Sequence, residues 1–555
     1  MRRSGLLAIA ILLSGCASIP SVGPVVQGPR VDVLRNDGYV RVIARPPVPG
    51  MTPDALVLGF LTASASVADG DDTALQYLTS AAAAAWNRRD TTVVYDAAAL
   101  TLTSVRDDVV RINAPKVGVI GSGYRYEAAE AGATVAEEFQ LQRIDGEWRI
   151  ASVPPALYLS EGDITRSFRS YPIFFFDPEF ERLVPEYVMV PIGTGNRATQ
   201  LLQVLLAGPD PAYGNALASA LPTRTEARNA TVLVNGVTAV VDIPGARMPV
   251  SEAKREAMLA QVVWTMWQLS EVVLVSLSID GQLVEWGDRT LFSSGDFAAF
   301  DPEESPQPAV LAYVDRERLI TQSAGERRSI DYAGPLSAGA ASRDGQLFAA
   351  INIDRTLLQL SSSGARPVPI ATGSDLAKPE FVPEGRLWFV DREVQGGLRL
   401  WDSSSGVRRV IVGLPAGSRI LDFAIASDRR RIALIVSDGV TTTLHVGVIQ
   451  YTDAGAKIVG LNRVERRLTS LTAVAWDSMR SLVVLGSAGA VGVQPIRVSL
   501  PVGGMTLLGG PANGVTITST AGEPIIVGDQ AGQLWEFRDN RWSAGVLGTA
   551  PQYVV

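Results

Sequence analysis

The chain has 555 residues, with one cysteine, one histidine and a formal net charge of −8 at pH 7. The single cysteine excludes an internal disulfide, and the single histidine excludes a zinc site with two or more histidine ligands. The negative charge argues against a phosphate-backbone partner, so no nucleic acid is expected. No cofactor is predicted, and the length favours three or four folded domains.

Residues 1–15 have the order of a secretory signal peptide. Arg2 and Arg3 form a basic start, and Leu6 to Leu13 form an apolar run that is too short to span a bilayer. The run ends in Leu13-Ser14-Gly15-Cys16, in which small residues precede the only cysteine. This pattern resembles a bacterial lipobox. An ordinary cleaved signal and a buried cysteine are the alternatives.

The lipobox interpretation assigns Cys16 as the lipidation site. Its thiol would carry diacylglycerol through a thioether, and its freed amine would be palmitoylated, as an S-diacylglycerol, N-palmitoyl cysteine. Two or three acyl chains anchor a protein firmly, because each buried methylene contributes about 0.8 kcal/mol. We therefore expect a lipoprotein held to the lipid bilayer of the cell membrane through Cys16, on the extracytoplasmic face.

Residues 16–49 combine the lipidated cysteine with a proline-rich tether. Few large apolar residues accompany the prolines, which favours a stiff and partly extended segment. The prolines are Pro20, Pro24, Pro29, Pro46, Pro47 and Pro49.

Residues 50–165 are predicted to form a small α+β domain of the NTF2-like kind. Thr52-Pro53-Asp54 is typical of a helix start, and a second helix is expected from Thr73 to Trp86. The apolar period then changes to two, which predicts strands over 91–95 and 116–126. Asp145-Gly146 between alternating runs indicates a β-hairpin, because both residues tolerate the positive φ of a type I′ turn.

Residues 170–290 are predicted to form a second α+β domain. Strands are expected over 173–176 and 187–192, and a helix from Ala198 to Ala207. Asn235-Gly236 and Asp280-Gly281 indicate two hairpins. A further helix is expected after a cap at Ser251.

Residues 295–555 lack a good helix and repeat a short theme, in which an acidic turn precedes an apolar strand. The copies are Ala341–Ala350, Phe381–Val390, Ala426–Leu434 and Ala475–Val484. The acidic positions Asp344, Glu384, Asp428 and Asp477 are 40, 44 and 49 residues apart. This spacing suits four-stranded blades, which stack because each sheet has two apolar faces to bury. The region is therefore predicted to be an all-β propeller of five or six blades, with a β-sandwich array as the alternative.

The order of these parts resembles the LpqB-type actinobacterial lipoproteins, and the middle domain resembles a GerMN module. The supporting motifs are Pro49-Gly50-Met51-Thr52-Pro53, Tyr77-Leu78-Thr79, Val93-Val94-Tyr95-Asp96, Leu183-Val184-Pro185 and Ala207-Gly208-Pro209. The resemblance implies action with the extracytoplasmic domain of an MtrB-like sensor histidine kinase, in cell-envelope and cell-division control through two-component regulation. It supplies no catalytic residues.

The candidates for catalysis in the sequence are weak, and we predict no enzyme. The acidic pairs Asp71-Asp72, Glu137-Glu138 and Glu303-Glu304 are expected to be solvated. A Ser-His-Asp triad would have to use His445, which has strand-like neighbours.

Three glycine-rich or aromatic segments have structural explanations that are stronger than functional ones. Gly193-Thr194-Gly195-Asn196 could cradle an anion but favours a turn into a helix. Gly121-Ser122-Gly123 suggests a bulge within a strand. Phe174-Phe175-Phe176 favours a buried strand over a partner surface.

Two functions compete with kinase modulation at this stage. One is a module that binds envelope glycans or peptides, at the propeller channel or the GerMN cleft. The other is a propeller hydrolase, since the propeller fold alone does not exclude catalysis.

Replacing Cys16 with serine tests the anchor. The variant lacks the thiol that takes diacylglycerol, so cleavage before residue 16 should stall and palmitate should not be incorporated. Metabolic labelling with palmitate and partitioning into detergent measure both effects. Equal labelling of the Cys16→Ser variant and the wild type would contradict the lipobox interpretation.

Overall fold

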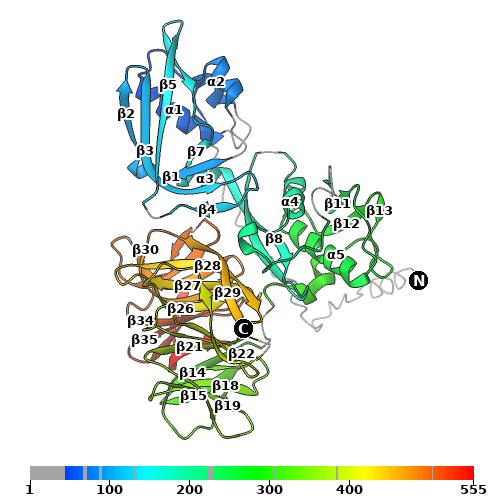
Figure 1. Ribbon diagram of the computed structural model, residues 1–555, viewed down its shortest axis with the longest axis vertical. Coiled ribbons are helices and arrows are strands. Elements are labelled where there is room, and N and C mark those ends of the chain that lie inside the picture. The colour runs from blue at the N-terminus through cyan, green and yellow to red at the C-terminus, as the bar shows by residue number, and fades with distance from the viewer. Residues whose placement is uncertain are drawn as a thin grey trace, which may run out of the picture. The chain divides into compact units, whose positions relative to one another are not determined.

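A computed structural model describes residues 44–66, 72–86, 91–130, 132–193, 195–222, 229–304, 308–382, 385–502 and 504–554. Its first domain packs three short helices against a seven-stranded sheet (Figure 1). The helices are α1 (Pro53–Ser64), α2 (Ser80–Ala85) and α3 (Glu161–Ser167). The strands are β1 (Thr92–Tyr95), β2 (Thr101–Arg106), β3 (Val109–Ile120), β4 (Tyr126–Ala128), β5 (Thr134–Ile144), β6 (Glu147–Ser152) and β7 (Leu157–Ser160).

The start of α1 and the β5–β6 hairpin confirm the local sequence signals. The Thr52 hydroxyl accepts a hydrogen bond from the Ala55 amide at 3.4 Å, and Pro53 opens the helix. Asp145 and Gly146 have φ angles of 53° and 85°, as the predicted turn requires. The buried face of α1, including Phe60, packs on the sheet at Phe139.

The single helix predicted from Thr73 to Trp86 is wrong. A 3₁₀ turn over Thr73–Tyr77 ends at Leu78, and α2 starts afresh at Ser80. Thr79 is extended, and its hydroxyl accepts a hydrogen bond from the Ala82 amide at 3.1 Å. A side-chain cap thus competes with helix continuation at this residue.

The strand predicted over 116–126 is also misplaced. Strand β3 begins earlier, at Val109, and ends at Ile120. Gly121-Ser122-Gly123 is therefore a turn that leads into β4 and not a bulge within a strand. The Tyr124 amide closes this turn on the Gly121 carbonyl at 2.9 Å, and Tyr124 itself has a positive φ of 60°.

The second domain combines a two-stranded and a four-stranded sheet with two long helices. Its strands are β8 (Phe168–Phe176), β9 (Leu183–Pro191), β10 (Thr231–Asn235), β11 (Thr238–Ile243), β12 (Leu274–Ile279) and β13 (Gln282–Leu283). Its helices are α4 (Arg197–Leu206) and α5 (Glu252–Met266). Phe174, Phe175 and Phe176 are fully buried, which confirms the core assignment of this run.

Both hairpins predicted in this domain are present. Strands β10 and β11 pair antiparallel, and β12 and β13 are joined by Asp280 and Gly281, both at positive φ. Asn196 caps α4, because its side chain accepts a hydrogen bond from the Thr199 amide at 3.1 Å. Ser251 precedes α5, but its side chain makes no capping hydrogen bond.

The third domain is a six-bladed propeller, which confirms the predicted fold class. Blade 1 contains β14 (Val310–Asp315), β15 (Arg318–Ser323), β16 (Glu326–Ser329) and β38 (Thr549–Tyr553). Blade 2 contains β17 (Leu336–Ala341), β18 (Leu347–Asn352), β19 (Thr356–Ser361) and β20 (Val368–Thr372). Blade 3 contains β21 (Leu376–Val382), β22 (Arg386–Asp391), β23 (Leu398–Asp402) and β24 (Gly406–Arg409).

The remaining three blades follow the same plan. Blade 4 contains β26 (Arg419–Ile425), β27 (Arg431–Ser437), β28 (Thr442–Thr452) and β29 (Gly455–Val464), with the short β25 (Ile411–Val412) beside β29. Blade 5 contains β30 (Leu468–Ser478), β31 (Ser481–Ala488), β32 (Gln494–Ser499) and β33 (Met505–Leu507). Blade 6 contains β34 (Gly514–Thr518), β35 (Ile525–Asp529), β36 (Gln533–Arg538) and β37 (Arg541–Leu547).

One helical segment lies in the region where no good helix was expected. A 3₁₀ helix over Ser294–Phe300 leads into the propeller, and Asp296 caps it by accepting a hydrogen bond from the Ser293 amide at 2.7 Å. Its Phe297 belongs to the core of the second domain.

The repeated sequence theme corresponds to the turn between the first and second strands of a blade. In two of the four copies the acidic residue accepts backbone amides of the turn. Asp477 instead lies at the end of β30 and accepts hydrogen bonds from the side chains of Arg497 and Ser519, and Glu384 lies outside the described residues. Asp428, which is fully buried, accepts hydrogen bonds from the amides of Arg430 and Arg431 at 2.9 and 2.8 Å. Asp344 likewise accepts one from the Gln346 amide at 3.0 Å. The repeat is therefore a folding signal.

Each blade is buried on both faces by its neighbours. In β18, Phe348 and Ala350 join a cluster shared with blade 1, whereas Ala349 and Ile351 join one shared with blade 3. This alternation follows from the period of two along a strand. Strand β38 pairs with β14, so the two ends of the propeller sequence close the ring within blade 1.

Every first strand also carries an irregularity that the sequence did not indicate. The register shifts between Leu336 and Ala338 in β17, between Ala377 and Glu380 in β21, and between Ile420 and Asp422 in β26. Similar shifts occur in β30 and β34, and where β14 meets β38. Such bulges re-aim side chains locally.

Replacing Phe389 with alanine tests the blade-to-blade core. Phe389 is 1% exposed in the cluster between blades 2 and 3, so the cavity should lower the free energy of unfolding by about 3–5 kcal/mol. Urea unfolding followed by tryptophan fluorescence measures this loss. The half-exposed Val407 on β24 provides the control, where alanine should cost less than about 0.5 kcal/mol. Similar losses at both positions would contradict the stacked-blade core.

Candidate functional site

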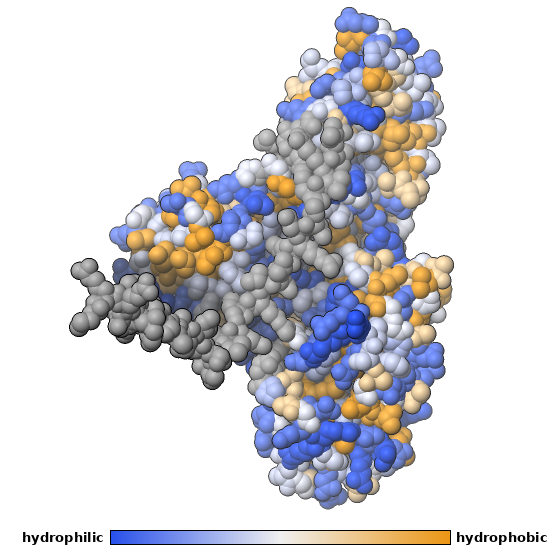
Figure 2. Space-filling model, turned by 180° about the vertical axis from the view of Figure 1, so that it is seen from behind, coloured by the Kyte–Doolittle hydropathy of each residue, from blue (hydrophilic) through white to orange (hydrophobic). Residues whose placement is uncertain are grey.

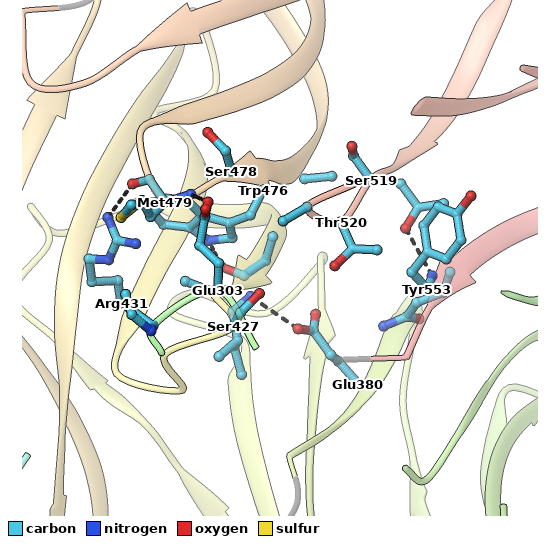
Figure 3. A pocket seen from close by; sticks show the side chains of 18 of the residues that line it. Glu303, Glu380, Ser427, Arg431, Trp476, Ser478, Met479, Ser519, Thr520 and Tyr553 are labelled. Atoms are coloured by element: carbon cyan, nitrogen blue, oxygen red, sulfur yellow. Dashed lines mark hydrogen bonds between the residues drawn. The ribbon is translucent and has the colours of Figure 1, made fainter. Parts of the chain in front are cut away.

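A pocket lies at one end of the propeller's channel, where the first strands of several blades finish (Figure 3). Its cavity volume is about 30 Å³, enough for one or two water molecules. Its lining includes Glu303, Lys378, Glu380, Arg431, Trp476 and Thr520. We call this region the axial pocket.

Glu380 is the most unusual group in the axial pocket. Its side chain comes from β21, is 4% exposed, and accepts a hydrogen bond from the Ile425 amide at 3.1 Å. Burial raises the pKa of this carboxyl to about 7, with Asp422 adding to the effect and Lys378 opposing it. Near neutral pH the group therefore exchanges between its charged and neutral forms.

Lys378 ties three inner strands together beside Glu380. It lies in the β21 bulge with a positive φ of 46°, which turns its side chain away from the regular pleat. Its ammonium group lies 3.2 Å from Asp422 Oδ2 on β26 and donates to the Val474 carbonyl on β30 at 2.6 Å. Lys378 also lines a second cavity, formed largely by the bulges of the first strands.

Arg431 forms one wall of the axial pocket. Its guanidinium donates to Asp428 Oδ2 at 2.6 Å and to the Met479 carbonyl at 2.7 Å, and it lies 4.5 Å from the Trp476 ring. It also donates to the Tyr187 hydroxyl of the second domain at 3.1 Å.

The second domain and the propeller belong to one compact unit and share further polar contacts. The Tyr187 hydroxyl donates to the Met479 carbonyl, and Arg430 pairs with Asp177 and Glu179. The wall of the axial pocket is thus in direct contact with strand β9 of the second domain.

The predicted acidic pairs do not form paired catalytic carboxylates. Glu138 pairs with Arg111 on the exposed face of the first sheet. Glu137, the residue before it on β5, faces the opposite side of the sheet. Glu304 bridges Arg182 and Arg343, whereas Glu303 accepts a hydrogen bond from the Met479 amide. Of the described residues in these acidic pairs, Glu303 is the one that lines the axial pocket. Of the pair at residues 71 and 72, only Asp72 lies within the described residues.

His445 lies on β28, away from the axial pocket, with its Nε2 at 2.9 Å from the Thr443 hydroxyl. Burial lowers the pKa of its imidazole to about 4, and Arg463 adds to this effect. The ring is therefore neutral at physiological pH. Cys16, the predicted lipidation site, lies outside the described residues.

The described residues contain no group of three or more His, Cys, Asp or Glu side chains that could hold a metal ion. Sequence reasoning missed Glu380 and Lys378, although Lys378-Pro379-Glu380 places two charges in a strand that is otherwise apolar. That contrast was the available signal, since a charge in an inner propeller strand must face the channel or a partner. In the same described part of the chain, no helix is long and apolar enough to cross a membrane.

Fold and site together define a multidomain β-propeller protein with two α+β domains and a pocket on the propeller axis. Three family models match the chain, one for each domain and in the same order. The first is "Lipoprotein LpqB, N-terminal domain", which matches residues 46–165. The second is "Sporulation and spore germination" (Germane), at 172–285, and the third is "Lipoprotein LpqB beta-propeller domain", at 329–553. The chain belongs to the LpqB family of lipoproteins.

Relatives named Lipoprotein LpqB align over nearly the full chain. The protein of Thermobifida fusca (strain YX) is 26% identical, covering 98% of this chain and 97% of the relative. That of Cutibacterium acnes (strain DSM 16379 / KPA171202) is also 26% identical, with the same coverage. Both names describe a lipoprotein and not an enzyme. TolB from Acinetobacter baumannii is 12% identical with a TM-score of 0.36, covering 52% of this chain and 84% of that structure.

Replacing Glu380 with glutamine tests the buried carboxyl. The amide oxygen can still accept the Ile425 hydrogen bond but never ionises. The folded pKa of Glu380 is about 7 against an ordinary 4.5, so the wild type should lose stability as pH rises from about 4.5 to 7. Above about pH 7 the variant should be more stable by up to about 3 kcal/mol, and near pH 4.5 the two should agree.

Denaturant unfolding across this pH range measures the difference. Glu326→Gln, at an exposed position on β16, is the control and should follow the wild type at every pH. A constant difference between Glu380→Gln and the wild type at all pH values would contradict the assigned titration.

Proposed function

We propose that this chain is a lipid-anchored protein of the extracytoplasmic membrane face, and that it binds and modulates a sensor histidine kinase. The anchor would be Cys16, as an S-diacylglycerol and N-palmitoyl cysteine, following a signal peptide over residues 1–15. The observation that carries the proposal is the match over nearly the whole chain to lipoproteins named LpqB. The kinase partner, of the MtrB kind, comes from the family resemblance.

The second domain supplies a surface suited to a protein partner. Its four-stranded sheet buries Val232, Val241 and Leu277 on one face, where they join the core with α4 and α5. Leu233 and Val240 pair across β10 and β11 on the opposite face and are 67% and 40% exposed.

Leu283 extends this exposed face. Val240 pairs with Ser276 on β12, and Leu283 pairs with Ser278, two residues further along the same strand. Residues two apart on a strand share a face, so Leu283 and Val240 lie on the same side of the sheet. Figure 2 shows apolar surface on this domain. Contiguous exposed apolar residues mark interaction sites more often than isolated ones do. We assign Leu233, Val240 and Leu283 as the kinase-facing surface.

The experiment places full-length kinase in proteoliposomes with or without the lipidated protein and measures autophosphorylation. The proposal expects at least a twofold change in rate and a cross-link to the kinase's extracytoplasmic domain. A kinase that lacks its extracytoplasmic domain should show neither the rate change nor the cross-link. An unchanged rate together with no cross-link would overturn the proposal.

The Leu233→Asp variant tests the assigned surface. A charge at this exposed position should leave the fold intact and weaken capture of the kinase about tenfold, because it places an unpaired carboxylate in an apolar contact. Leu507→Asp is the matched control, since Leu507 is 48% exposed on the propeller strand β33. Equal loss of capture in both variants would contradict a surface on the second domain.

A further inference from the structure

A larger cavity lies at the other end of the propeller's channel, where the first strands of the blades begin. Its volume is about 310 Å³, which falls within the range of small-molecule sites. The wall comes from β17, β21, β26, β30, β34 and β38, so all six blades contribute to it. We call this region the channel cavity.

Four charged side chains line the channel cavity, and the protein itself occupies three of them. Lys378 pairs with Asp422 at 3.2 Å. Asp529 is held by its own turn, where two backbone amides and the Trp535 indole donate hydrogen bonds to its carboxylate. The fourth group, Arg392, has no ion pair within the part of the chain that the structure describes.

Arg392 directly follows β22 and reaches the bulge of β26. Its Nε donates to the Leu421 carbonyl at 2.7 Å, which fixes the guanidinium at the channel wall. The described residues supply no hydrogen-bond partner for its two Nη groups. Because these donors lie in one plane, the free edge of the guanidinium suits the two oxygens of a carboxylate. Asp529 does not compete for this edge, since blade 6 lies across the ring from blade 3.

Gln552 provides a second polar group without a partner. Its residue is 9% exposed and lines both the axial pocket and the channel cavity. Among the described residues its side-chain amide makes no hydrogen bond. A buried amide without a partner is costly, so a ligand that both donates to it and accepts from it would relieve that cost. A secondary amide has both functions.

The remaining wall is largely apolar. Leu376, Val515 and Ile517 line the channel cavity together with small alanine and proline side chains. Small-molecule sites typically combine such a lining with a few polar groups that fix the orientation of the ligand. The wall therefore suits an aliphatic group beside the carboxylate and the amide.

We infer that the channel cavity binds a small N-acylated amino acid with a free carboxylate and an aliphatic side chain. The carboxylate pairs with Arg392, the amide bonds with the Gln552 side chain, and the aliphatic group lies on the apolar wall. This site is separate from the kinase-facing surface on the second domain and does not rest on the proposed function.

The test titrates the full-length protein by calorimetry with three probes of similar size. N-acetyl-L-leucine should bind saturably at one site. N-acetyl-L-leucinamide has a neutral amide in place of the carboxylate and should bind at least about tenfold more weakly. The third probe, 4-methylpentanoate, keeps the carboxylate but lacks the acylamino group, and should bind about fivefold more weakly.

Two variants assign the contacts. Arg392→Gln should weaken binding of N-acetyl-L-leucine at least about tenfold and leave the affinity for N-acetyl-L-leucinamide unchanged. Gln552→Leu should weaken binding of N-acetyl-L-leucine about fivefold and leave the affinity for 4-methylpentanoate unchanged. Arg541→Gln is the control, because it removes the same charge at an exposed position on β37. It should bind every probe as the wild type does.

Absence of saturable binding, or equal affinity of the wild type for N-acetyl-L-leucine and its amide, would overturn the inference. Equal losses of both these probes in Arg392→Gln would do the same, because they would show a structural role for this residue. The comparison of probes on the wild type needs no variant, so it decides the outcome even where a variant does not fold. The kinase is absent from this assay, so a negative result leaves the kinase proposal unaffected.

Discussion

The stacking of six blades, each with two apolar faces, is the constraint on which the propeller depends. A four-stranded sheet that exposes either face to water loses the hydrophobic stabilisation of that face, so each blade requires both neighbours. The alternation in β18 shows this requirement at the level of single residues: Phe348 contacts one neighbour and Ile351 the other. With only one cysteine in the chain, no disulfide can substitute for this stacking.

The axial pocket is a product of the same ring. Only closure brings Glu380 of blade 3, Trp476 of blade 5 and Tyr553 of blade 1 around one space. The bulge in β21 then directs the Lys378 side chain across the channel to blades 4 and 5. A charged network thus lies on the axis of a domain whose blade-to-blade interfaces are apolar.

Local chemistry decided which parts of this structure were predictable. Asp145-Gly146 and Asp280-Gly281 form turns because of their own backbone preferences. The blade turns at Asp344 and Asp428 are stabilised because the carboxylate accepts nearby amides. The bulges depend on strands far apart in sequence, so no local pattern indicates them. The two charges of Lys378 and Glu380 in an apolar strand are a local signal, but the partners of these side chains again come from distant strands. The break after Tyr77 was missed for a different, local reason. The alanine run favours a continuous helix, but the Thr79 side chain caps a new helix at Ser80.

Closure through β38 has a consequence for folding during synthesis. A chain that is made from its N-terminus presents β14, β15 and β16 long before β38. Until then β14 has an unpaired edge, and the facing sides of blades 1 and 6 remain in water. The ring therefore closes only after β38 has been made. In that interval the nascent propeller exposes an apolar blade face and a free strand edge, which are the features that favour aggregation of an incomplete β-structure.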